Sequence, residues 1–216
     1  MLPQPKIAAL ALLVALLALT GIAFATTGQQ TLRFKVYLDQ SPIGEHTFEL
    51  STGGPDKRVV SRARFDVNLL IFNAYRYRHE SREQWRDGCL ERIQSSTDDN
   101  GKDFRVEGER IADALRLQVN GKPDRLPACV STFAYWEPSF LKNPRLLNPQ
   151  TGELVEVRLE PQGRERRSYR GREVDAERYR LQADGLDITL WYTREGDWIG
   201  LESDTGKGRT LRYERL

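Results

Sequence analysis

Two ionisable residues with the capacity for acid–base chemistry, His79 and Glu83, lie in the segment AYRYRHESREQW, residues 74–85. The segment alternates with a period of two, as a β-strand does. One face is charged or polar; the other carries Tyr75, Tyr77, His79, Ser81, Glu83 and Trp85. In a strand, residues four apart lie about 13 Å from each other along the chain. His79 and Glu83 therefore do not form a catalytic pair by themselves.

A functional role for His79 requires partners from neighbouring strands. His46 is one candidate, because it lies on the same side of its segment as Phe48 and Leu50. A hydrolase would need one of the two histidines within about 3 Å of a Ser, Asp or Glu in an accessible cleft. The structural alternative, which we favour, is a ring packed between aromatic side chains, with its nitrogens bonded to a backbone group or a hydroxyl.

Other catalytic and metal-binding patterns are weak. Two histidines are too few for a His-rich metal site. The segment TDDNGKD, residues 97–103, offers oxygen ligands, but its spacing does not match a calcium loop and fits a hairpin turn better. The sequence has no G-x-S-x-G motif and no Gly-rich phosphate loop. We therefore assign no catalytic residue, no metal and no cofactor.

Aromatic side chains give a stronger indication of a binding site. Trp and Tyr residues recur on several expected strands and in the segment 132–152. A curved sheet with such rings on its inner face either closes into a dry core or leaves a cavity for an apolar ligand. If a cavity is present, we expect seven residues to line it: Tyr75, Tyr77, His79, Trp85, Phe133, Tyr135 and Trp136.

The elements that position these residues are mostly strands. In TLRFKVYLD, residues 31–39, the apolar Leu32, Phe34, Val36 and Leu38 share one face, which predicts a strand with one buried side. Similar patterns occur at 43–51, 57–68, 74–86, 89–97, 103–109, 114–121, 153–161, 173–183, 185–194, 197–203 and 209–215. Short joints such as Asn120–Gly121 favour antiparallel hairpins. The sequence predicts a mainly β fold, with a curved antiparallel sheet, a half-barrel or open barrel, of about 10–12 strands.

The segment TFAYWEPSFLKNPRLLNPQTG, residues 132–152, interrupts this pattern. It has three prolines and bulky apolar residues without alternation, so we expect one or two short helical turns. Its rings need a surface to bury against, and the concave side of the sheet would supply one. The sheet is therefore expected to wrap around this short helical, proline-rich segment.

The N-terminus has the features of a secretory signal. Lys6 precedes a long uncharged apolar run, and Ala23-Phe24-Ala25 supplies a small-x-small cleavage site. We interpret residues 1–25 as a signal peptide and residues 26–216 as a single exported β domain. The alternative is an uncleaved anchor, because the run approaches the roughly 20 residues that span a membrane. With cleavage, no membrane span is expected.

The charge balance and the cysteines bear on partners and compartment. With 33 Lys and Arg against 31 Asp and Glu, the chain lacks the basic excess that nucleic acid binding needs. Cys89 and Cys129 form an even pair in the exported part, which favours a disulfide, with two isolated thiols as the alternative. Closing a loop of about 40 residues would stabilise the fold by roughly 2–4 kcal/mol. We expect a periplasmic or secreted location.

Several strings together resemble a known family. FKVYLDQSPIGEHTFEL, FNAYRYRHESREQWRDGCL, TDDNGKDFRV, LPACVSTFAYW and LLNPQTGE are similar to a family of exported proteobacterial proteins of unknown function. Its members resemble, in fold only, the curved half-barrels of periplasmic lipoprotein carriers. The resemblance implies that Cys89 and Cys129 both belong to the family pattern, and it transfers no catalytic residue.

These observations favour an exported protein that binds or carries an apolar or lipid-like ligand in the cell envelope. A protein-interaction or structural module of the envelope, docking an envelope protein through its charged face or a sheet edge, is the alternative. A hydrolase is the least favoured of the three.

Overall fold

The computed structural model describes residues 28–69, 72–205 and 208–216. The expected signal peptide, residues 1–25, lies outside the described residues. The long strands are β1 (Gly28–Leu38), β2 (Ser41–Gly53), β3 (Asp56–Leu69), β4 (Phe72–Arg86), β5 (Cys89–Asp99), β6 (Lys102–Ile111), β7 (Ala114–Val119), β8 (Lys122–Pro127), β12 (Arg158–Tyr169), β13 (Arg172–Ala183), β14 (Leu186–Tyr192), β15 (Trp198–Asp204) and β16 (Thr210–Arg215). Between β8 and β12 lie β9 (Ser131–Thr132), the 3₁₀ turn η1 (Pro138–Lys142), β10 (Arg145–Leu147) and β11 (Leu154–Glu156).

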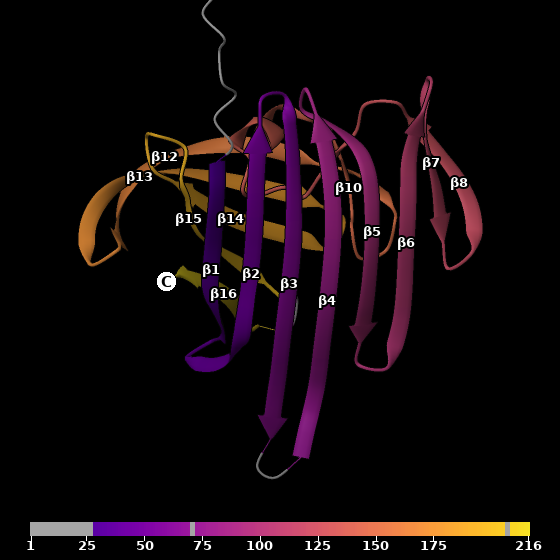
Figure 1. Ribbon diagram of the computed structural model, residues 1–216. Helices are drawn as coiled ribbons and strands as arrows, with labels where there is room; N and C mark the ends of the chain where they lie inside the picture. Colours follow the sequence, from indigo (N-terminus) through magenta and orange to yellow (C-terminus); the bar gives the residue numbers. More distant parts are fainter. Residues whose placement is uncertain (1–27, 70–71, 206–207) are drawn as a thin grey trace, which may run out of the picture.

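The long strands form one thirteen-stranded sheet in the order β12-β13-β14-β15-β16-β1-β2-β3-β4-β5-β6-β7-β8. It consists of two antiparallel meanders, β1–β8 and β12–β16, joined where β16 pairs with β1. Figure 1 shows β1–β6 side by side, with β12–β15 crossing behind them. Within the described residues β12 and β8 do not pair, so the sheet stays open. The expected fold class, mainly β with a curved antiparallel sheet, is confirmed.

The strands follow the alternation in the sequence. In β1 the inward side chains of Leu32, Phe34 and Val36 are buried, whereas Arg33 is exposed. The hairpins use the turn residues that the sequence supplies. At the β7–β8 turn, Asn120 and Gly121 both have positive φ, 50° and 78°, which is the backbone of a type I′ turn.

The sheet has thirteen strands, more than the expected 10–12. The difference arises in two parts of the chain, at β8 and at β11–β12. β8, KPDRLP, carries two prolines and no buried face, which suits an edge strand and hides it from a periodicity search. The strand expected at 153–161 is two elements, β11 and β12, and β12 continues to Tyr169. In the proline-rich segment, the expected helical turn is present as η1, accompanied by the short strands β9 and β10.

The segment between β8 and β12 lies on the concave side of the sheet. β10 pairs with β9 in parallel and with β11 in antiparallel, and Figure 1 shows β10 between the two walls of strands. Its side chains at Phe140, Leu146 and Leu147 are fully buried in one core with residues of both meanders, such as Phe34 and Leu190. The sheet therefore wraps around this segment, as expected.

The outer face of the sheet carries alternating charges that form ion pairs. Arg62, for example, lies 2.9 Å from Glu49 and 3.4 Å from Glu80, on the strands to either side. Exposed pairs of this kind contribute about 0–1 kcal/mol each. They keep the outer face polar, whereas the concave face carries most of the apolar core.

The expected disulfide between Cys89 and Cys129 is present, with the two Cα atoms 4.9 Å apart. It joins the first residue of β5 to the segment that enters the concavity. Beside it, the amide of Leu90 donates to the carbonyl of Val130 over 3.1 Å. A disulfide is consistent with an oxidising compartment outside the cytoplasm.

Candidate functional site: a cavity on the concave face

A cavity of about 200 Å³ lies between the sheet and the segment that it encloses. Strands β2–β4 contribute one wall, and the segments 132–136 and 148–150, with Leu186, contribute the rest. The lining residues are His46, Phe48, Val59, Ser61, Tyr77, His79, Ser81, Glu83, Thr132, Phe133, Tyr135, Trp136, Asn148, Pro149, Gln150 and Leu186.

The cavity exists because small side chains occupy the middle of the sheet wall. Ser61 pairs with Ser81 in register, and Ala63 pairs with His79. Larger side chains lie on either side of this small-residue region, including Phe65 on β3. The enclosed segment contributes Phe133, Tyr135 and Trp136 to the lining of the cavity.

The structure places five of the seven predicted ligand-binding residues in this lining: Tyr77, His79, Phe133, Tyr135 and Trp136. The other two lie outside it. Trp85 is buried with its ring edge-on to Trp136, at a centroid distance of 5.5 Å. The hydroxyl of Tyr75 donates to Asp99 over 2.6 Å. The role of the five in binding stays a prediction.

His79 has the environment that we expected for a structural histidine. Its ring stacks on Tyr77 at a centroid distance of 6.3 Å, and its Nδ1 lies 2.8 Å from the hydroxyl of Thr97. Burial lowers the pKa of His79 to about 4, so the ring is neutral at neutral pH.

His46 forms a contact that the sequence did not reveal. Its Nε2 lies 2.7 Å from the hydroxyl of Ser61, and its Nδ1 lies 3.2 Å from the hydroxyl of Tyr213. Finding this contact from the sequence would require the register of β2 against β3. Burial, with the nearby charge of His79, lowers the pKa of His46 well below its usual range.

The geometry that a hydrolase requires is therefore present in His46 and Ser61, but the electrostatics oppose it. A general base must accept a proton during the reaction. The two ring nitrogens of His46 contact hydroxyls and not a carboxylate, and burial disfavours the imidazolium. The arrangement suits a neutral ring held in place at the cavity wall.

Glu83 forms a separate network and does not bond His79. Its Oε2 accepts from the indole nitrogen of Trp85 over 2.9 Å and from the hydroxyl of Thr132 over 3.3 Å. Its Oε1 accepts from Ser81 over 3.2 Å. Burial raises the pKa of Glu83 to about 7, although the three hydrogen bonds act in the opposite direction. The carboxyl is thus protonated for much of the time at neutral pH.

Several cavity-lining polar groups have no hydrogen bond to any residue that the structure describes. They include Nε2 of His79, the hydroxyl of Tyr135, the indole nitrogen of Trp136 and the side-chain nitrogen of Asn148. The hydroxyl of Tyr77, by contrast, donates to Gln150 over 3.0 Å. Burial raises the pKa values of both tyrosines above the ordinary range, so both are neutral. The cavity therefore presents uncharged hydrogen-bonding groups among rings.

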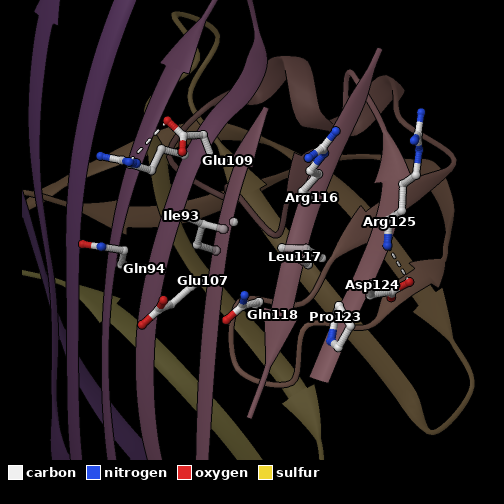
Figure 2. Close-up of a pocket in the computed structure, with 12 residues that line it drawn as sticks. Ile93, Gln94, Glu107, Glu109, Arg116, Leu117, Gln118, Pro123, Asp124 and Arg125 are labelled. Carbon is white, nitrogen blue, oxygen red and sulfur yellow. Dashed lines mark hydrogen bonds and ion pairs between the residues drawn. The ribbon is translucent and has the colours of Figure 1, made fainter. Parts of the chain in front are cut away.

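A second hollow, of about 700 Å³, lies on the outer face of β5–β8 (Figure 2). Its rim carries three arginines and three acidic residues: Arg92, Arg116, Arg125, Glu107, Glu109 and Asp124. The opposite charges balance, and Arg92 pairs with Glu109 over 3.3 Å. Apolar ligand sites are lined mainly by apolar side chains. The outer hollow is therefore less suited to an apolar ligand than the inner cavity.

The residues that the structure describes contain no group of three or more His, Cys, Asp or Glu that could hold a metal ion. Among them, no helix is long and apolar enough to cross a membrane.

Fold and cavity together define a class: open, curved antiparallel β proteins with an enclosed segment and a small concave cavity. The chain belongs to the family described as a domain of unknown function, DUF6134, which matches residues 34–216. This agrees with the expected resemblance to a family of unknown function. No curated protein matches the sequence.

A solved structure has a similar fold. It is the crystal structure of a beta-barrel-like protein of the domain of unknown function DUF1849 from Brucella abortus. The TM-score is 0.65 at 10% sequence identity, and the match covers 89% of this chain and 97% of that chain. At this identity the similarity concerns the fold alone.

Proposed function

We propose that this protein binds an apolar or amphipathic ligand of the cell envelope in its concave cavity. The observation that carries the proposal is the partly open cavity between β2–β4 and the segment 132–150, in which aromatic rings and hydrogen-bonding groups line both sides. Sites of this kind, apolar with a few placed polar groups, are typical of small-molecule binding.

The volume limits what the cavity can hold. A dry cavity of about 150 Å³ is enough to bind benzene, so the cavity of about 200 Å³ accepts a ligand of about one ring. A lipid-like molecule could insert only part of one chain. This narrows the proposal from a lipid carrier to a binder of a small amphipathic molecule or of the end of a longer one.

The compartment and the fold support the proposal. The signal-like N-terminus and the disulfide between Cys89 and Cys129 suit a periplasmic or secreted protein. The curved half-barrel architecture resembles that of periplasmic lipoprotein carriers, which supports a ligand on the concave side by analogy.

The first experiment is mass spectrometry of organic extracts from protein purified out of its native periplasm. A ligand is expected in near-stoichiometric amount. In Ser81→Leu the larger side chain extends from the sheet wall into the cavity. This variant should therefore retain at most about a tenth of the ligand that the wild type retains. The matched control is Ser96→Leu, on the exposed face of the neighbouring strand, which should retain the wild-type amount.

A second variant keeps the test valid if Ser81→Leu does not fold. Trp136→Leu removes a lining ring without adding volume, and it should also reduce the retained ligand. The proposal fails if wild-type protein retains no ligand and toluene, added as an apolar probe, causes no shift in the NMR signals of the cavity residues.

The outer hollow on β5–β8 supports a second candidate function, the docking of an envelope protein. Its rim presents exposed charges of both signs (Figure 2), and β8 leaves one sheet edge unpaired. Charge reversal by Arg116→Glu should then abolish co-purification of a specific partner. The control is Arg194→Glu, which is also exposed but lies on the other meander. Co-purification that is equal in both variants would contradict docking at this hollow.

A further inference from the structure

The charges around the cavity are as informative as its volume. Of the lining residues, none is Lys, Arg or Asp, and Glu83 is the one acidic residue. Both oxygens of Glu83 already accept hydrogen bonds from the protein. A charged ligand group would thus enter a partly open, mostly apolar space with no counter-ion available to it, which disfavours its binding.

The ionisable side chains of the lining strengthen this conclusion. Burial lowers the pKa values of His46 and His79 and raises those of Tyr77 and Tyr135. All four side chains are neutral at neutral pH. An anionic head group would find no cation in the wall, and a cationic group would find only a carboxyl that is engaged with Trp85, Ser81 and Thr132.

Two of the unpartnered groups in the lining, an imidazole nitrogen and a phenol, can accept a hydrogen bond, which the indole nitrogen of Trp136 and the side-chain nitrogen of Asn148 cannot. His79 Nε2 and the Tyr135 hydroxyl have no partner among the described residues, whereas Ser61, Tyr77 and Glu83 are engaged with protein atoms. A neutral imidazole nitrogen and a phenol can each bond a hydroxyl, and a phenol can also donate to a carbonyl. Neither atom is among the fully buried polar atoms without a partner in the described part of the chain, so each is open to a polar ligand group.

We propose that the cavity selects an uncharged ligand with an apolar part of about one ring and one hydroxyl or amide group, bonded by Tyr135 and His79. This inference rests on the proposed function and names the ligand class for the same site. A free small molecule of this class bonds both groups, whereas the apolar end of a lipid chain bonds neither.

Four ring-sized probes test the charge selectivity: toluene, benzyl alcohol, benzoate and benzylammonium. Binding is measured by NMR titration at about pH 6, with Glu83 mostly protonated. Benzyl alcohol is expected to bind at least about 100-fold tighter than either charged probe, because burying an unpaired charge costs several kcal/mol. Charged probes that bind within about tenfold of benzyl alcohol would overturn the inference.

Two variants test the hydrogen bonds. Tyr135→Phe should weaken the binding of benzyl alcohol about three- to tenfold, the usual net effect of one hydrogen bond. It should leave the affinity for toluene unchanged. Tyr179→Phe is the matched control, because Tyr179 lies on β13 outside the cavity lining and its hydroxyl donates to Glu177; it should leave the affinity for both probes within about twofold of wild type. His79→Phe keeps a ring at that position and should repeat the effect of Tyr135→Phe.

The outcomes separate this inference from the proposed function. The assignment of an uncharged polar ligand is wrong if toluene binds and benzyl alcohol does not. It is also wrong if both Tyr135→Phe and His79→Phe leave the affinity for benzyl alcohol unchanged. In either case the cavity remains a binding site. If none of the four probes binds, both the inference and the proposed function fail.

Discussion

The hydroxyl of Ser61 lies 2.7 Å from Nε2 of His46 at the wall of the cavity. The other ring nitrogen of His46 lies 3.2 Å from the hydroxyl of Tyr213. His46 lies on β2. Its ring contacts Ser61 on the neighbouring strand β3 and Tyr213 on β16, which lies on the far side of β1, so it links the two meanders. Its stacking on Phe48, at a centroid distance of 4.1 Å, fixes the ring plane. The two hydroxyls hold this half-buried imidazole in one orientation.

Removal of the Ser61 hydroxyl should destabilise the fold. Ser61→Ala leaves Nε2 of a half-buried histidine without its partner, which costs about 1–3 kcal/mol. Urea unfolding monitored by tryptophan fluorescence measures this loss. The matched control, Ser96→Ala, lies on the exposed face of β5 and should change the free energy of unfolding by less than about 0.5 kcal/mol. Equal effects of the two variants would contradict the importance of the bond.

Glu83 should make stability depend on pH. Burial raises its pKa from 4.5 to about 7, so between these values the native state holds a proton that the unfolded chain releases. The stability from Glu83 is therefore fully present below about pH 4.5 and is lost as pH rises through about 7. His79, whose pKa is lowered to about 4, acts in the opposite direction, because its stability contribution rises between about pH 4 and 6.5.

Glu83→Gln isolates the contribution of the carboxyl, because the histidines remain in both proteins. Relative to wild type, the variant should gain roughly 2–3 kcal/mol of stability between pH 5 and pH 8. Urea unfolding of both proteins across this range measures the difference. A stability difference that stays constant with pH would show that Glu83 titrates as an exposed glutamate does.

Gly44 is required where β2 approaches β3. Its φ is +155°, and a Cβ added there would overlap the carbonyl oxygen of Arg64. Gly44→Ala should therefore cost about 3 kcal/mol or more, in the range of the most damaging substitutions. Gly54 is the matched control, because it also has a positive φ, +61°, but open space around it. Gly54→Ala should cost about 1–2 kcal/mol, and thermal unfolding distinguishes the two.

The sequence predicts the fold class well because most of its strands have one buried face. The alternation of Leu32, Phe34 and Val36 with charged neighbours indicates a strand before any partner is known. Edge strands lack this signal: β8, with Pro123 and Pro127, is exposed along most of its length. The parallel pairing of Leu146 with Ser131 joins residues of one irregular segment, and no period of the sequence reveals it.

The site is less predictable because it depends on register and on distant contacts. The period of two correctly places His79 on the ring-bearing face, and its distance from Glu83 follows from strand geometry. The contact between His46 and Ser61 depends on how β2 and β3 align, which the turn residues do not specify. The hydrogen bond to Glu83 from Thr132 joins residues 49 positions apart. Such contacts become visible only in the folded chain.

The disulfide should couple redox state to the cavity. Cys129 immediately precedes the buried residues 130–132 and the lining residues from Thr132 to Trp136, and its bond to Cys89 holds this segment against β5. Replacing both cysteines by alanine should lower the free energy of unfolding by roughly 2–4 kcal/mol, since the bond closes a loop of about 40 residues in the unfolded chain. It should also weaken the binding of benzyl alcohol, because the wall that carries Tyr135 is less firmly held. Urea unfolding and NMR titration measure the two effects. The double variant could lose stability and still bind the probe as the wild type does. That result would show that β9 and β10 hold the segment without the disulfide.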